Sequence, residues 1–182
     1  MSALFVALVV ASVPAEARGL TLNFGARVES FYSYSFNEPS NGVNNYRIID
    51  NRHNSFGLSA VAAHLQADFH GAHARVALWV GHTPSTIYAG EPTADDSLGP
   101  SDASVWRLLE EAYAGYRFDM GLTIQGGLFL GPIGLESVRA HENWNWSSSI
   151  LNFGFPFYHT GLRANLDVGP HHTVSVWAVN GF

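Results

Sequence analysis

Residues 20–36, LTLNFGARVESFYSYSF, alternate apolar and polar side chains with a period of two. This period predicts a β-strand, because successive side chains of a strand point to opposite faces of the sheet. A strand of a soluble protein runs about 5 or 6 residues, whereas a tilted strand needs about 9 to 11 residues to cross the apolar part of a bilayer. The segment is longer than either, so its apolar face could contact lipid or, in a soluble sandwich, a second sheet.

The composition of the chain excludes several classes of protein. Only 13% of the 182 residues are charged, about half the fraction of an ordinary globular chain, while 47% are hydrophobic. The net charge is -6 and Lys and Arg form no cluster, which excludes the basic patch that nucleic-acid binding requires. The chain contains no cysteine, which excludes disulfides, cysteine metal sites and thiol nucleophiles.

The first 17 residues have the features of a signal peptide. An apolar run covers residues 3–13, and Ala15-Glu16-Ala17 has the small-x-small form of a signal-peptidase site, so we expect cleavage after Ala17. The run is shorter than the roughly 20 residues that a membrane-spanning helix needs. The alternative interpretation is a strand or helix buried in the mature domain.

Six further segments have the pattern of strands, and the connections between the seven strands alternate in length. The further strands are expected at residues 53–69, 74–81, 105–118, 122–130, 156–168 and 173–179. The long connections cover residues 37–52, 82–104 and 131–155, and the short ones cover residues 70–73, 119–121 and 169–172. Outer-membrane barrels have short turns at one rim and long loops at the other, whereas the Greek-key connections of sandwiches mix the lengths.

The predicted fold is therefore all-β, an antiparallel up-and-down transmembrane β-barrel. Seven strands are an odd number, and single-chain bacterial barrels use even numbers. We accordingly expect an incomplete barrel, with residues 18–182 as the N-terminal part of a longer domain.

Two irregularities of the strands are expected. A bulge is expected near residues 59–62, where the apolar side chains change from one face of the strand to the other. Glu110 falls among the apolar side chains of its strand, so we expect it at the rim or displaced by a bulge. Aromatic residues near strand ends are expected in interfacial girdles: Tyr32, Tyr34, Phe36, Trp79, Tyr116, Phe118 and Tyr158.

The polar phase of the strands contains charged residues of both signs. Such residues could line an aqueous pore and select solutes by charge and size, or they could pair with one another as a polar plug in a narrow barrel. The candidate pore-lining residues are Arg27, Glu29, Arg75, Arg107, Glu111, Gln125, His159 and Arg163.

The third long loop contains two tryptophans interleaved with asparagines. Flat apolar rings beside amide donors suit sugar rings or a constriction, although the same tryptophans could simply pack the loop against the barrel wall. The candidate residues of this loop are Glu136, Asn143, Trp144, Asn145 and Trp146.

The sequence predicts neither a metal site nor catalysis. The pairs His70/His73 and His171/His172 lie in turns without a third ligand at metal-binding spacing. No Gly-x-Ser-x-Gly motif is present, so a serine hydrolase is not indicated. We therefore expect no metal, no cofactor and no enzymatic activity.

Several motifs resemble a known family. The segments FYSYSFNEPSNG, EEAYAGYRF, GGLFLGPIGLES and NWNWSSSILNFGFPFYHTGLRANL are similar to those of the OmpL-like β-barrel porins of bacterial outer membranes. The resemblance implies a monomeric or homo-oligomeric pore in outer-membrane lipid for passive diffusion of small hydrophilic solutes, without cofactor or catalysis. Family members are longer, and Asn180-Gly181 resembles a point about midway through their domain.

Three other functions remain open on the sequence. A secreted all-β carbohydrate-binding domain would be soluble without detergent. A small eight-stranded barrel acting as an adhesin or structural anchor would conduct little, because its interior is filled by side chains. An outer-membrane enzyme would need a convergent catalytic site.

Overall fold

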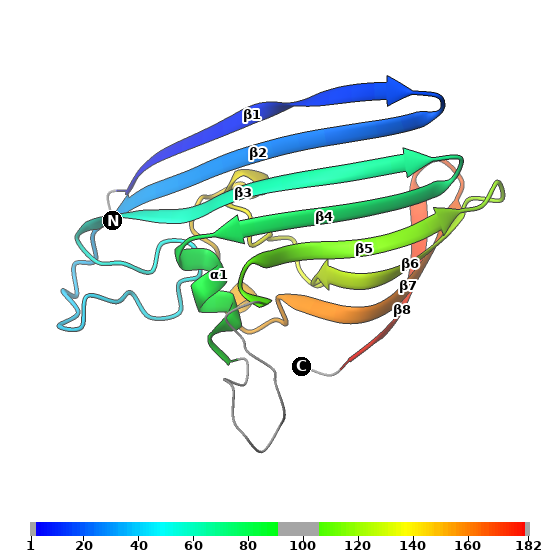
Figure 1. The fold of residues 1–182 in the computed structure, drawn as a ribbon. Helices are drawn as coiled ribbons and strands as arrows, with labels where there is room; N and C mark the ends of the chain where they lie inside the picture. The colour runs from blue at the N-terminus through cyan, green and yellow to red at the C-terminus, as the bar shows by residue number, and fades with distance from the viewer. Residues whose placement is uncertain (1–2, 91–105, 181–182) are drawn as a thin grey trace, which may run out of the picture.

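The computed structural model describes residues 3–90 and 106–180 and consists of one curved antiparallel sheet (Figure 1). Each strand pairs with the next in the chain, and the order is β1 to β8 without crossovers. The strands are β1 (Ala3–Ala17), β2 (Leu20–Ser33), β3 (Ser55–Phe69), β4 (Ala72–Val80), β5 (Leu109–Arg117), β6 (Leu122–Leu130), β7 (Tyr158–Val168) and β8 (His172–Val179). The sheet is not closed, because β1 and β8 occupy its two edges. The predicted all-β, up-and-down, incomplete barrel is confirmed.

The seven strands predicted from residue 20 onward correspond to β2 to β8. The eighth strand, β1, covers most of the predicted signal peptide and pairs with β2 along its length. A two-residue turn joins them, with Arg18 and Gly19 at φ angles of 51° and 80°. Two consecutive residues with positive φ angles form the type of tight turn whose twist matches that of the two strands of a hairpin. A strand in this segment was the alternative that the sequence left open, and cleavage after Ala17 stays a prediction.

The two ends of the sheet differ, as the alternation of connection lengths predicts. One end carries short turns at residues 18–19, 70–71, 118–121 and 169–171, and we call it the turn end. The opposite end carries the connections of residues 34–54, 81–108 and 131–157, and we call it the loop end (Figure 1). Residues 82–90 of the predicted second long loop form helix α1 (His82–Ile87) and the 3-10 helix η1 (Tyr88–Gly90), and residues 91–105 lie outside the described part. The third connection contains η2 (Ala140–Glu142) and α3 (Ile150–Phe153).

Both predicted irregularities of the sheet are present as bulges. Between β2 and β3 the pairing shifts from Glu29 with Ala60 to Ser30 with Leu58, which leaves Ser59 as the extra residue. Between β4 and β5 the pairing shifts from Ala77 with Glu111 to Leu78 with Leu109, which leaves Glu110 as the extra residue. The second bulge is decisive for the site, because it places the consecutive residues Glu110 and Glu111 on the same side of the sheet.

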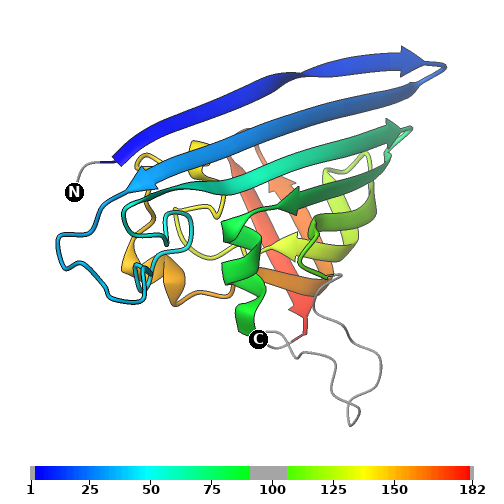
Figure 2. The ribbon, with the colours of Figure 1, turned by 60° about the vertical axis from the view of Figure 1, so that its left-hand side comes forward.

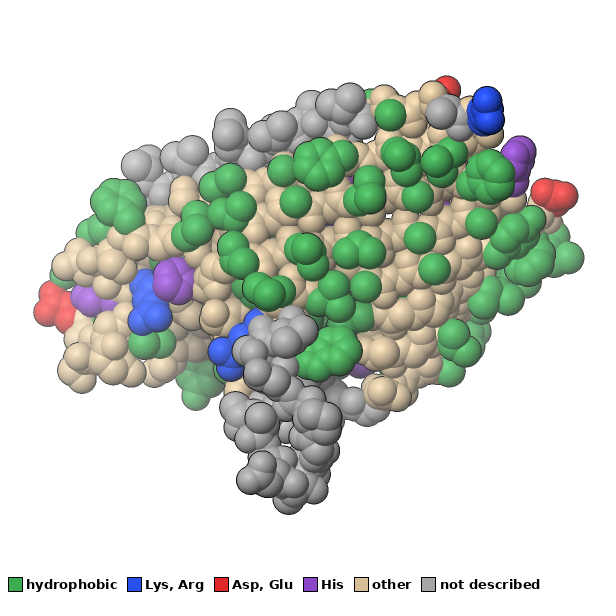
Figure 3. All heavy atoms as spheres, in the orientation of Figure 1, with side chains coloured by type: hydrophobic (Ala, Val, Ile, Leu, Met, Phe, Trp, Pro, Cys, Tyr) green, Lys and Arg blue, Asp and Glu red, His purple; other side chains and the backbone are tan. Residues whose placement is uncertain are grey.

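The two faces of the sheet have opposite character. The outer face is apolar along β2 to β8, and Figure 3 shows hydrophobic side chains spread over its visible part with few charged ones among them. Exposed hydrophobic side chains of this face include Phe24, Val28, Leu65, Val76, Leu78, Tyr116, Ile124, Leu162, Leu166, Val174 and Val176. The inner face carries buried polar residues, including Arg27, Glu29, Glu111 and Gln125. This is the alternation that the period of two predicts.

The core lies at the loop end, where the long connections fold over the inner face (Figure 2). Its buried members come from the first loop, from α1 and η1, from the third loop and from two strands: Ile48, Ile49, Ala62, Trp79, Ile87, Tyr88, Val138 and Ala140. The girdle prediction is wrong for Trp79, which is 2% exposed within this cluster. It is also wrong for Tyr158, which packs against the cluster with its ring centroid 4.5 Å from that of Tyr88.

The chain enters the core after β4 through Gly81. Its φ angle is 141°, and a Cβ atom at this position would lie 2.4 Å from the carbonyl oxygen of Ser59. Only glycine allows such a close approach between the two backbones. The residue therefore lets α1 begin directly at the end of β4 and place Ile87 in the core.

Candidate pore-lining site

A chain of alternating charges crosses the inner face near the loop end. Glu110 accepts hydrogen bonds from two arginines, with its Oε1 atom 2.7 Å from Arg27 Nη2 and 2.6 Å from Arg139 Nε. Glu111 does the same, with its Oε2 atom 2.6 Å from Arg139 Nη2 and 3.0 Å from Arg75 Nε. We call the five residues, in the order Arg27, Glu110, Arg139, Glu111 and Arg75, the charge ladder. Four of them stand on strands β2, β4 and β5, and Arg139 comes from the third loop.

Three further ionisable side chains extend the charge ladder. Glu29 lies 3.6 Å from Arg27 Nε and 2.7 Å from Nδ1 of His141, and Glu142 Oε1 lies 3.1 Å from Arg139 Nη1. Burial alone would lower the pKa of Arg139, but the carboxylates of Glu110 and Glu111 hold it above its ordinary value. Arg139 therefore keeps its positive charge at neutral pH.

The pKa of Glu142 responds to the same surroundings. Burial would raise it, but the Ser137 hydroxyl and the Arg139 guanidinium stabilise the carboxylate and lower the pKa below its ordinary value. The third-loop residues Arg139 and Glu142 thus both stay ionised at neutral pH.

A second polar group lies on the inner face closer to the turn end. Its centre is Gln125, whose Nε2 atom lies 2.6 Å from His73 Nε2 and whose Oε1 atom accepts a hydrogen bond from Arg163 Nε. The Arg163 guanidinium carbon lies 4.1 Å from the ring centroid of Phe129, 4.9 Å from that of Tyr113 and 5.3 Å from that of Trp177. These rings hold the guanidinium in place by cation–π attraction and leave it on the inner face.

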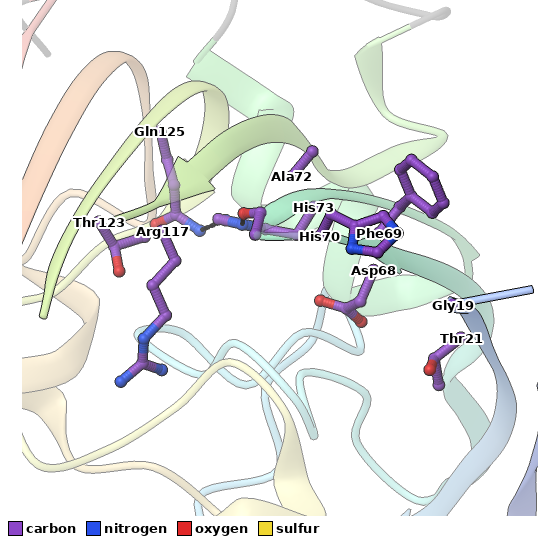
Figure 4. Close-up of a pocket in the computed structure, with 11 residues that line it drawn as sticks. Gly19, Thr21, Asp68, Phe69, His70, Ala72, His73, Arg117, Thr123 and Gln125 are labelled. Carbon is purple, nitrogen blue, oxygen red and sulfur yellow. Dashed lines mark hydrogen bonds between the residues drawn. The ribbon is translucent and has the colours of Figure 1, made fainter. Parts of the chain in front are cut away.

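The inner face is hollow at the turn end. A cavity of about 400 Å³ lies there, and Figure 4 shows that residues far apart in the sequence contribute to it. Its lining is Gly19, Thr21, Asp68, Phe69, His70, Gly71, Ala72, His73, Arg117, Thr123 and Gln125. At its edge Arg117 Nη2 lies 2.9 Å from Asp167 Oδ2, in a pair that is largely exposed. The cavity is thus polar and lined by both signs of charge.

The structure places most of the predicted pore-lining residues on the inner face. Arg27, Arg75 and Glu111 belong to the charge ladder, Glu29 contacts it, and Gln125 and Arg163 form the second polar group. His159 pairs across the sheet with Phe129, is half-buried, and its Nδ1 atom has no hydrogen-bond partner among the described residues. The prediction that Arg107 stands on a strand is wrong, because β5 begins at Leu109 and Arg107 lies in the turn before it.

The predicted loop residues are not brought together into one surface. Glu136 accepts hydrogen bonds from the backbone amide and hydroxyl of Ser149, and Asn143 bonds the backbone of Ser137, so both stabilise the loop itself. Trp146 packs against the core cluster, as the packing interpretation predicts. The other two candidates, Trp144 and Asn145, are exposed, and Trp144 is fully so.

Sequence reasoning missed Glu110 and Arg139 as members of the site. A signal was present for Glu110, because two consecutive glutamates on a strand must either expose one charge on the apolar face or form a bulge. For Arg139 the signal was weak, since one arginine in a 25-residue loop does not reveal which carboxylates it meets. His141 and Glu142, two and three residues further on, were missed for the same reason.

Residues 3–90 and 106–180 contain no group of three or more His, Asp or Glu side chains that could hold a metal ion. None of the helices in this part of the chain is long and apolar enough to cross a membrane.

The family of the chain follows from a comparison with known proteins. No curated protein and no solved structure matches the chain. A family model, described as "Putative beta-barrel porin-2, OmpL-like", matches residues 21–182 and therefore covers β2 to β8 with all the polar groups described above. The chain belongs to this family of OmpL-like β-barrel porins.

Proposed function

We propose that the protein is an outer-membrane porin that forms a water-filled channel for passive diffusion of small hydrophilic solutes. It acts without catalysis, metal or cofactor, and its partners are the lipid of the bacterial outer membrane and the diffusing solutes. The family supports a barrel porin. The observation that carries the proposal is the opposite character of the two faces of the same strands, which are apolar outside and charged inside.

The outer face favours lipid as its surroundings. A soluble domain rarely exposes a contiguous apolar patch larger than a few hundred Å². Here exposed hydrophobic side chains recur on every strand from β2 to β8. This disfavours a secreted carbohydrate-binding domain, which would present the whole face to water.

The inner face favours water-filled surroundings that ions can enter. At the turn end a cavity of about 400 Å³ is lined by side chains of both signs, and an aqueous lumen solvates such charges far better than an apolar core does. The loops of the loop end fold over this face, which would narrow the channel without replacing its polar lining.

We further propose that residues 18–182 form the N-terminal part of a barrel that additional strands close, and that residues 1–17 are the signal peptide that directs export. The open sheet supports the additional strands, because side chains on both faces of β8 are exposed. The small-x-small motif Ala15-Glu16-Ala17 after an apolar run supports the signal peptide, whose removal would leave β2 at the edge in place of β1.

The test is single-channel recording in planar bilayers with the longer protein that contains this chain. Discrete, ohmic conductance steps are expected, with reversal potentials that shift when Arg75 is replaced by glutamine. Membrane-inserted protein whose heat-dependent gel mobility shows that it is folded, and which nevertheless conducts nothing, would contradict the channel and leave a plugged barrel with an adhesive or structural role.

A further inference from the structure

We propose that Arg139 fixes the third loop against the inner wall of the sheet and thereby sets both the width and the charge selectivity of the channel. The inference rests on the proposed channel function, which it deepens by assigning the loop position and the ion preference to one side chain. Arg139 acts as a positioning residue, because its contacts are with protein carboxylates, two of them on the wall and one on the loop.

Arg139 is the member of the charge ladder that joins the third loop to the inner wall of the sheet. Its three guanidinium nitrogens contact three different carboxylates, with Nε to Glu110 at 2.6 Å, Nη2 to Glu111 at 2.6 Å and Nη1 to Glu142 at 3.1 Å. Two of these carboxylates stand on β5 and one stands on the loop. The planar fork of arginine suits such a multiple contact, which lysine cannot reproduce.

The neighbours of Arg139 show that the loop docks at this point. Val138 and Ala140 are 6% and 2% exposed, and both belong to the core cluster with residues of the first loop and of η1. The backbone amide of His141 also points to Glu29, at 3.5 Å from its Oε1 atom. Residues 138–141 are therefore the segment where the third loop meets the wall.

The rest of the loop is braced by hydrogen bonds of its own, which do not use the Arg139 side chain. Its ends are held together by a hydrogen bond from the Gly131 amide to the Phe157 carbonyl oxygen at 2.8 Å. Its interior is closed by the bonds of Glu136 to Ser149 and of Asn143 to Ser137. Loss of the Arg139 contacts would thus loosen the docked segment from the wall without breaking these internal bonds.

The charge balance at this level of the lumen depends on the same residue. The glutamates Glu29, Glu110, Glu111 and Glu142 face three arginines, and removal of Arg139 leaves four carboxylates against Arg27 and Arg75. A ring of excess carboxylates attracts cations and repels anions. Loss of Arg139 would therefore widen the channel and shift it towards cations.

The matched variants are Arg139→Gln and Arg75→Gln. Both remove one positive charge from the charge ladder, but of the two residues Arg139 alone stands on the third loop and links it to the wall, because Arg75 stands on β4. In planar bilayers we expect both variants to raise the cation-to-anion permeability ratio severalfold, and only Arg139→Gln to increase the single-channel conductance. Equal conductance of Arg139→Gln, Arg75→Gln and the parent protein would overturn the proposal.

A second readout tests the loop without relying on conduction. The chain contains no cysteine, so Ala140→Cys introduces one thiol at a site that is 2% exposed. In detergent-solubilised folded protein we expect slow reaction with a charged maleimide, and a rate on the order of tenfold higher or more when Arg139→Gln is added, because a docked buried site opens only rarely. Addition of Arg75→Gln instead should leave the rate nearly unchanged.

The two readouts separate failure of the inference from failure of the channel function. An unchanged thiol reaction rate in Arg139→Gln would overturn the role of Arg139 in holding the loop, whatever the conductance shows. If the parent protein and all variants are folded and silent, the channel function falls, and with it the part of the inference that concerns width and selectivity. Arg139→Lys keeps the charge without the fork, so we expect its ion preference to stay near that of the parent while its thiol rate rises.

Discussion

The loop end and the turn end of the sheet are built from the same strands, yet they fill the inner face in different ways. At the loop end, Ile49 and Tyr88 are 0% and 1% exposed, and the charge ladder is almost entirely buried. At the turn end, the inner face opens into a cavity of about 400 Å³, and the pair Arg117–Asp167 is 64% and 42% exposed.

The difference follows from the length of the connections. A two-residue turn such as His70-Gly71 reverses the chain within the hydrogen-bonding plane and is too short for its backbone to fold back over the sheet. A connection of more than twenty residues can fold back, and here the third loop brings both apolar anchors and Arg139 to the wall. Similar ion pairs should therefore contribute very differently to stability at the two ends.

The largest contrast is expected between Glu110→Ala and Asp167→Asn. Loss of Glu110 leaves Arg27 and Arg139 without their shared carboxylate in a buried site, which should lower the free energy of unfolding by about 3 to 5 kcal/mol. Loss of Asp167 removes an exposed, solvent-screened pair and should cost about 1 kcal/mol or less. Urea unfolding of the reconstituted protein, followed by tryptophan fluorescence, measures both.

Equal shifts of the unfolding midpoint in Glu110→Ala and Asp167→Asn would contradict this expectation. They would show that water screens the charge ladder in the folded protein and that its burial does not govern stability.

The turns give the next largest contrast, between Gly71→Ala at the turn end and Gly42→Ala at the loop end. Both glycines have left-handed backbones, with φ angles of 87° and 68°, so each substitution should cost about 1 kcal/mol. At Gly71 the new Cβ would also lie 2.8 Å from the carbonyl oxygen of Arg117, whereas at Gly42 no atom lies within 4 Å. We expect Gly71→Ala to cost about 2 kcal/mol or more in the same unfolding measurement. Equal losses would show that the turn yields to the added methyl group.

The smallest effect concerns the pH dependence of the first loop. Asp50 is 1% exposed, its two carboxylate oxygens have no hydrogen-bond donor among the described residues, and burial raises its pKa despite the opposing charge of Arg47. An acid whose pKa is raised by folding binds protons more tightly in the folded state, so it destabilises the fold as pH rises. The destabilisation is absent below the ordinary Asp pKa of 3.8 and complete above the raised value.

Asp50→Asn should therefore stabilise the protein at neutral pH by about 1 kcal/mol and have no such effect in acid. Unfolding midpoints measured from pH 3 to pH 8 check this, with Asp167→Asn as the exposed control. A gain from Asp50→Asn that is independent of pH would contradict the assignment to the buried carboxylate.

The sequence predicted the sheet well because the relevant forces are local. The period of two in residues 20–36 corresponds in β2 to exposed Phe24 and Val28 on one face and buried Arg27 and Glu29 on the other. The bulges in β3 and β5 followed from breaks in the same alternation in those strands. It predicted less of the site: Arg27, Arg75 and Glu111 were identified as inward-facing, but Glu110 and Arg139 were not identified as their partners. The ion pairs of the charge ladder join residues that are up to 83 positions apart in the sequence, as between Arg27 and Glu110, and no periodicity reports such a distance.

The sequence by itself thus determined that this chain forms long antiparallel strands with one apolar and one charged face, joined by turns at one end and loops at the other. Side-chain alternation and turn residues act between neighbours, so the order of residues suffices to reveal them. Only the tertiary structure decided that the third loop folds inward and places Arg139 between Glu110 and Glu111, and that Trp79 belongs to the core instead of the membrane interface. These outcomes depend on which distant groups satisfy one another's charge and fill one another's space, and that is settled when the chain packs.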